Sequence, residues 1–362
     1  MDRLRGAEKI DTPQNGQVVS AHRIKQTPSR FHWVNMFAVA VKLLVSSWPG
    51  RCRLWLLMML VAGTCVSCTP GYRPQIPAPP TLSETELSDM AYEAIGHRTG
   101  AMIVVNPRDG RVIKRVSHGT DAQFVVSPFG LAQIVTAYAA LEAGVIDDRT
   151  LLPCRQGGRV DVATALAHSC PEFFAQLSRR ITPAQFTRAA AVVGFTYFGI
   201  ESPTYDQTLI RPVSAKLPDP FTTAALTALA VKGEGMEARE LHFAQLASSL
   251  ASGVTASERF AAYIMASARV VAPPVVPFNQ HALAVVRRGL LKAVEEGEAG
   301  AAAHPGKQVA GRTGSGQGQA IFISYAPATD PEIALVVYLK DATGQEAAEV
   351  AGKFYEFWFR QK

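Results

Sequence analysis

Ser127-Pro128-Phe129-Gly130-Leu131-Ala132-Gln133-Ile134-Val135-Thr136-Ala137-Tyr138-Ala139-Ala140-Leu141-Glu142-Ala143-Gly144 is the stretch that decides the fold. Pro128 suits a helix entry, where its missing N–H is not needed, and Gly144 supplies a C-terminal stop. Between them apolar residues recur at helical spacing, namely Leu131, Ile134, Val135, Tyr138 and Leu141. The pattern predicts a mostly buried helix of about four turns.

This helix resembles the nucleophile helix of penicillin-binding transpeptidases, the serine D,D-acyltransferases that cross-link peptidoglycan. In that family Pro-Gly-Ser-Thr-Phe-Lys precedes an apolar Thr-Ala-x-Ala-Ala-Leu-Glu-x-Gly run, and residues 136–144 keep that run almost unchanged. Counted back without gaps, the serine position holds Gly130 and the lysine position holds Gln133. Glycine offers no nucleophile and a glutamine amide is no base near neutral pH. We therefore expect the fold of the family without its acylating pair.

The segment 165–174 resembles the second family motif, Ala-Leu-x-x-Ser-Cys-Asn-x-x-Phe, in which the serine relays protons and the asparagine orients the lysine and the substrate. Ser169 is retained, whereas the asparagine position holds Pro171, which has no side-chain donor and no backbone N–H. We expect Ser169 to cap a helix, because a relay without a nucleophile has nothing to serve.

The segment 309–316 resembles the third motif, Gly-Lys-Thr-Gly, and is followed by an apolar strand that ends in Tyr-Ala-Pro. Thr313 and Gly314 are unchanged, and Arg312 replaces the lysine while keeping its positive charge. The resemblance implies that Arg312, Thr313 and Gly314 bind the carboxylate and backbone of a substrate.

The rest of the chain supports the same fold class, α+β of the β-lactamase/transpeptidase type. Residues 101–105 and 112–116 flank an Asn-Pro-Arg-Asp-Gly turn and predict a hairpin. We expect a five-stranded antiparallel sheet flanked by helices, beside an all-helical lobe, with the site between them. Predicted helices start near 81–88 and cover 173–177, 184–193, 224–232, 257–268 and 349–359.

The N-terminal part differs in composition from the rest. Residues 1–53 carry nine Lys/Arg and three Asp/Glu, which is the whole excess of the +6 net charge. We expect a basic leader over 1–53, a signal or anchor segment over 54–68, a proline-rich linker over 69–83 and a transpeptidase-like domain over 84–362. The anchor is either a lipid on Cys65 or Cys68, as in a lipoprotein, or an uncleaved apolar segment. Both alternatives place the domain outside the cytoplasm, tethered to a membrane.

Because the domain would be exported, Cys154 and Cys170 are expected to form a disulfide, the alternative being two buried thiols. His242, His281 and His304 lack ligand spacing, so we expect no metal, and nothing in the chain indicates a cofactor. Residues 54–362 carry no net charge, which argues against a nucleic-acid partner.

The function expected from these residues is binding without catalysis. The partner would be a peptidoglycan stem peptide or a protein of cell-wall synthesis. The alternative is an active D,D-transpeptidase with a non-standard nucleophile such as Ser127, although Ser127 lies one helical turn too early and has Gly130 where the lysine belongs.

Overall fold

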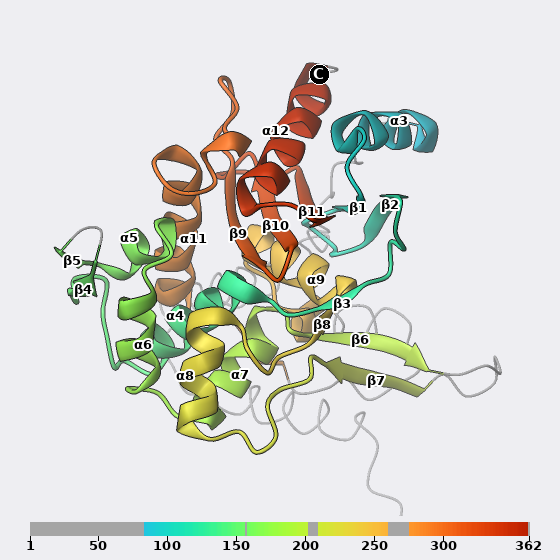
Figure 1. Cartoon of the computed structure of the whole chain (residues 1–362). Coiled ribbons are helices and arrows are strands. Elements are labelled where there is room, and N and C mark those ends of the chain that lie inside the picture. The colour runs from blue at the N-terminus through green and yellow to red at the C-terminus, as the bar shows by residue number, and fades with distance from the viewer. Residues whose placement is uncertain (1–82, 156–157, 202–208, 260–274, 361–362) are drawn as a thin grey trace, which may run out of the picture. The chain divides into compact units, whose positions relative to one another are not determined.

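A five-stranded antiparallel sheet, in the order β2-β1-β11-β10-β9, forms the core of one lobe (Figure 1). Its strands are β1 (Gly100–Val105), β2 (Val112–His118), β9 (Ala310–Gly316), β10 (Gln319–Ala326) and β11 (Ile333–Lys340). The computed structural model describes residues 83–155, 158–201, 209–259 and 275–360. The expected leader, the anchor segment and the linker up to residue 82 lie outside the described residues. No helix within the described ranges is long and apolar enough to cross a membrane.

The sheet is apolar on both faces because each face packs on a different layer. Met102, Phe322 and Val337 belong to a core with α3 (Glu84–Ile95) and α12 (Gly344–Arg360), which cover one face (Figure 1). Ile103 and Val336, on the opposite face, pack in a second core that includes α9 (Glu240–Ser252). Successive side chains of a strand alternate between faces, so a doubly covered strand reads as a continuous apolar run.

The two covering helices start at sequence signals of the same kind. Ser83 caps α3, with Glu86 completing a capping box. At α12 the backbone N–H of Thr343 donates to Glu346 at 2.8 Å, and the N–H of Glu346 donates to the Thr343 hydroxyl at 3.3 Å. This reciprocal pair starts the helix at Gly344, five residues before the start expected from the apolar pattern alone.

The second lobe is built around the decisive stretch. A short 3₁₀ turn, η2 (Phe129–Leu131), leads into α4 (Ala132–Glu142), and every residue from Ala132 to Leu141 is buried. Gly144 follows with a φ of +65°, as a helix stop requires. The surrounding helices are α5 (Val162–Ala167), α6 (Pro171–Ser178), α7 (Pro183–Val193), α8 (Thr223–Lys232) and α11 (Gln280–Glu295).

The expected fold class is confirmed, and among the described residues three two-stranded sheets accompany the helices outside the central sheet. They are β3 (Val125–Val126) with β8 (Ala238–Arg239), β4 (Leu152–Cys154) with β5 (Gly158–Val160), and β6 (Thr196–Glu201) with β7 (Leu209–Ser214). Their strands are short or carry glycine and proline, which weakens the period-two signal. Helices α9 and α11 were also not expected as separate elements. Most of the expected helix 257–268 lies outside the described residues.

Candidate functional site

An open groove of about 1120 Å³ runs between the edge strand β9 and the helical lobe. The three motif segments expected from the sequence all contribute to its wall. Its lining includes Ser127, Gly130, Gln133, Ser169, Pro171, Thr313 and Gly314. Gly314 lies close to the helical lobe, since a Cβ built there would be 2.7 Å from the Pro128 carbonyl oxygen. The structure thus brings the predicted site residues together, with Arg312 directly beneath them.

Gly130, at the expected serine position, faces the other two motifs. A Cβ built on it would lie 3.2 Å from the Thr313 carbonyl oxygen and 3.8 Å from the Ser169 hydroxyl oxygen. A serine at this position would therefore stand where the three motifs meet. As glycine, the residue contributes only its backbone.

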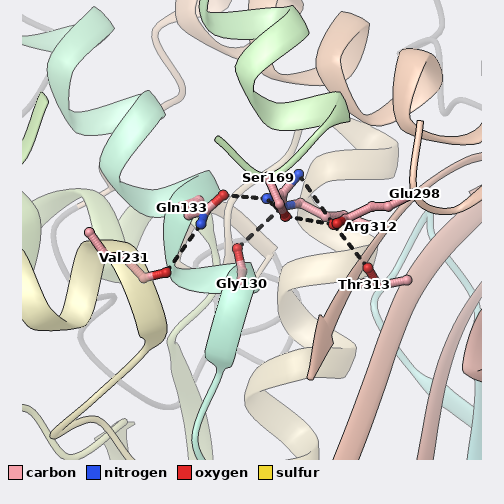
Figure 2. Close-up of polar contacts among 7 residues, drawn as sticks. All are labelled: Gly130, Gln133, Ser169, Val231, Glu298, Arg312 and Thr313. Carbon is pink, nitrogen blue, oxygen red and sulfur yellow. Dashed lines mark hydrogen bonds and ion pairs between the residues drawn. The ribbon is translucent and has the colours of Figure 1, made fainter. Parts of the chain in front are cut away.

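Gln133, at the expected lysine position, is buried and fully engaged. Its exposed fraction is 2%. Its side-chain oxygen accepts from Arg312, and its Nε2 donates to the Val231 carbonyl oxygen at 3.3 Å (Figure 2). The amide is thus held between β9 and the end of α8, and offers no basic group.

Arg312 extends from β9 beneath the groove, with an exposed fraction of 0%. Its Nε donates to the Gly130 carbonyl oxygen at 3.2 Å, and its Nη2 donates to the Ser169 hydroxyl at 2.8 Å as well as to Gln133 (Figure 2). Burial lowers the pKa of the guanidinium, and the neighbouring carboxylate of Glu298 opposes that shift. The side chain that was expected to bind a substrate carboxylate is therefore occupied by partners from its own chain.

Glu298 is the site residue that the sequence did not indicate. Its Oε1 accepts from the Ser169 hydroxyl at 2.7 Å and from the Thr313 hydroxyl at 3.0 Å. The same oxygen lies 3.9 Å from Nη1 of Arg312. Glu298 follows α11 in a turn that carries no recognisable motif, so only the tertiary structure brings it here.

The expectation that Ser169 caps a helix is wrong. The cap residue of α6 is Cys170, which makes no side-chain capping bond, and Pro171 occupies the first turn, where its missing N–H costs nothing. The Ser169 hydroxyl instead lies between Arg312 and Glu298, because its φ of +49° turns the chain between α5 and α6.

Ser127, the alternative nucleophile, lies in the groove wall, where its hydroxyl is engaged by backbone groups. Its hydroxyl donates to the Gly233 carbonyl oxygen at 2.8 Å and accepts from the Phe129 N–H at 3.2 Å. In the parts of the chain that the structure describes, no hydrogen bond joins a lysine to a serine hydroxyl.

A disulfide joins Cys154 of β4 to Cys170, with a Cα–Cα distance of 5.4 Å. It ties the segment that carries Ser169 and Pro171 to a neighbouring hairpin. The second motif is thus fixed covalently to β4.

The charged residues in the groove wall are mostly paired with each other. Lys216 lies 3.2 Å from Glu237, and Lys232 lies 3.5 Å from Glu234. With Asp219 and Glu298 the described lining holds four acids against two lysines. The groove is therefore not a general anion-attracting surface.

The sheet, the buried central helix and the three converging segments define a protein of the transpeptidase fold. Solved structures agree: the transpeptidase domain of Burkholderia pseudomallei penicillin-binding protein 3 matches with a TM-score of 0.60 at 17% identity, over 81% of this chain and 98% of that one. Residues 100–356 match the family model of the penicillin-binding protein transpeptidase domain, and the chain belongs to this family.

Two further structures show the same likeness. Pseudomonas aeruginosa PBP2, solved in complex with WCK 5153, has a TM-score of 0.60 at 18% identity over 76% of this chain and 77% of that one. The D,D-transpeptidase domain of an Eggerthella lenta peptidoglycan glycosyltransferase has a TM-score of 0.58 at 19% identity over 76% and 81%. At these identities the likeness concerns the fold. A search of curated proteins finds no significant match.

Proposed function

We propose that this transpeptidase-fold protein acts in peptidoglycan synthesis by binding and not by acyl transfer. The observation that carries the proposal is the pair Gly130 and Gln133 at the positions of the nucleophile and its base. Acyl transfer needs a hydroxyl that attacks and a group that takes its proton. Removing the nucleophile of a serine hydrolase leaves only the residual rate that binding and oxyanion stabilisation supply.

The contacts of Gln133 also support a site without acyl transfer, in addition to the missing serine hydroxyl and lysine amine. A lysine at this position would bring a second cation against the guanidinium of Arg312, which is already fully buried. Two like charges in a low-dielectric site disfavour each other. The surroundings of position 133 therefore fit an uncharged amide.

The groove can still bind a peptide, because β9 is an edge strand. Among the described strands it pairs with β10 and no other, and its residues line the groove. An extended peptide can add to such an edge through main-chain hydrogen bonds. We propose a peptidoglycan stem peptide, or an extended segment of a cell-wall synthesis protein, as the partner.

The proposed location is outside the cytoplasm, on a tether formed by the N-terminal residues. The disulfide between Cys154 and Cys170 supports an oxidising compartment, where such bonds persist. The lipid on Cys65 or Cys68 and the uncleaved anchor both remain proposals.

The absence of acyl transfer is tested by incubating the full chain with a fluorescent penicillin and recording its intact mass. We expect no covalent adduct, for the wild type and for Ser127→Ala alike. An adduct on the wild type that disappears in Ser127→Ala would overturn the proposal in favour of the alternative nucleophile.

Binding is tested by titrating a stem peptide into the full chain. Ser315 is exposed in the groove wall on β9, so Ser315→Trp should fill the peptide path and abolish binding. Lys340→Trp, at an exposed strand end outside the groove lining, is the matched control and should bind as the wild type does. Equal binding by both variants would place the peptide elsewhere.

A further inference from the structure

The hydroxyls of Ser169 and Thr313 donate to one oxygen atom and the guanidinium of Arg312 lies beside it; these three residues are here called the donor triad. That atom is Oε1 of Glu298, which is 2.7 Å from the Ser169 hydroxyl and 3.0 Å from the Thr313 hydroxyl (Figure 2). Two hydroxyls and a guanidinium around one oxygen make a carboxylate-binding arrangement, since ionised acceptors form the stronger hydrogen bonds. The arrangement is therefore a receptor whose occupant comes from the same chain.

The backbone holds this occupant in place. The N–H of Glu298 donates to the Ala167 carbonyl oxygen at 3.2 Å, beside the turn that carries Ser169. The preceding residue, Gly297, approaches that carbonyl so closely that a Cβ would lie 2.2 Å from its oxygen. Only glycine permits this contact, so the turn is built to bring Glu298 to the donor triad.

The occupant leaves part of the receptor unused. Nη1 of Arg312 is buried and makes no hydrogen bond with any residue that the structure describes, although it lies 3.9 Å from Oε1 of Glu298. The Glu298 side chain remains 33% exposed to the groove. A buried donor without an acceptor is costly, and a carboxylate free to choose its position could satisfy it better than Glu298 does.

We propose that Glu298 sets the ligand specificity of the groove by occupying the donor triad and thereby excluding ligand carboxylates. A second carboxylate at this point would be repelled by the first and would find the two hydroxyls already engaged. The groove accordingly selects peptides whose group at this point is uncharged, such as an amide. The choice of a peptide ligand rests on the proposed function, whereas the occupied receptor stands on the geometry alone.

The receptor is tested without any peptide, by measuring the melting temperature of the full chain in sodium acetate and in sodium chloride at equal ionic strength. In Glu298→Ala the vacated triad should bind acetate, so acetate should raise the melting temperature by at least ~2 °C over chloride. The wild type should show no such difference. The matched control is Glu234→Ala, which removes a groove carboxylate paired with the exposed Lys232 and should behave as the wild type does. An equal response of all three proteins would overturn the proposal.

The specificity is tested with two peptides that differ only in a C-terminal carboxylate or carboxamide. The wild type should prefer the carboxamide, and Glu298→Gln, which keeps the side-chain size but not the charge, should shift the ratio of dissociation constants toward the carboxylate by about tenfold or more. If Glu298→Ala does not fold even in acetate, Glu298→Gln alone still tests whether Glu298 excludes ligand carboxylates. An unchanged ratio would overturn the role of Glu298. If neither peptide binds any form, the proposed function fails and the specificity role falls with it, whereas the acetate result still decides whether Glu298 occupies a carboxylate receptor.

Discussion

Replacing Arg312 by methionine tests whether the buried guanidinium and Gln133 hold the site together. The side chain of Arg312 has an exposed fraction of 0%, and that of Gln133 has 2%, so the bond between them is shielded from water. Methionine is unbranched and apolar and fills much of the same space. The change removes the donor and leaves the packing nearly intact.

The expected magnitude follows from what each partner loses. Without Arg312 the oxygen of Gln133 is a buried acceptor with no donor, which costs about 1–3 kcal/mol. The Gly130 carbonyl and the Ser169 hydroxyl are only half-buried, so water can replace the lost donor there. Arg312→Met should therefore destabilise the protein by about 2–3 kcal/mol. Gln133→Leu should cost a similar amount, because it leaves a buried cation with one acceptor fewer.

The double variant separates this pair from mere loss of packing. Replacing both partners by apolar groups removes the unsatisfied acceptor and the buried charge together, so Arg312→Met with Gln133→Leu should cost about as much as one single variant. Urea unfolding of all four proteins gives the coupling energy, expected at about 2 kcal/mol. Arg287 is the control: its Nε and Nη2 donate to two backbone carbonyls at 2.6 and 2.7 Å, and its loss should be additive with Gln133→Leu. Additive costs for Arg312 and Gln133 would refute the reasoning.

Further predictions concern the groove glycines, the disulfide and the buried His242. Gly314→Ala should lower the free energy of unfolding, measured in urea, by about 1–3 kcal/mol, because its Cβ would lie 2.7 Å from a backbone carbonyl oxygen. Gly130→Ala, whose Cβ would lie 3.2 Å from the nearest atom, should lower it clearly less. Equal losses would contradict this reasoning. Replacing Cys154 and Cys170 by serine removes a cross-link spanning 16 residues and should lower stability by about 3 kcal/mol, with the variant losing the wild type's sensitivity to reductant. Burial lowers the pKa of His242 to about 4. The stability that its neutral imidazole contributes is therefore complete above pH ~6.5 and is lost as the pH falls toward 4, by up to about 1.4 kcal/mol per pH unit. His242→Gln should flatten this part of the curve of unfolding free energy against pH.

Much of the fold could be predicted because local signals and the global structure agree. The apolar run of α4 with its glycine stop, the first hairpin and the three motif segments in chain order indicated the sheet and the groove, and the fold class is confirmed. The β6–β7 ribbon was missed, since Gly199 and Pro212 interrupt the alternation that marks a strand. The early start of α12 could have been found from the Thr343–Glu346 capping box.

The contacts of the site were less predictable than its residues. Gly130, Gln133 and Arg312 could be named from motif alignment, but alignment could not indicate that Arg312 turns inward to Gln133. Glu298 lies 129 residues from Ser169 in the sequence, in a turn without periodicity or motif. Its position depends on the close backbone approach at Gly297, which only the assembled structure reveals.

The inward course of Arg312 has a mechanical consequence for the groove. The guanidinium starts on the sheet and holds both η2 and the segment before α6, which belong to the other lobe. Moving the two lobes apart would either expose the guanidinium or leave it buried without hydrogen-bond acceptors. The side chain of Arg312 therefore holds the groove at a fixed width. We therefore expect free and occupied forms to superimpose with backbone shifts below about 1 Å, and adaptation to a ligand to be confined to side chains such as Glu298.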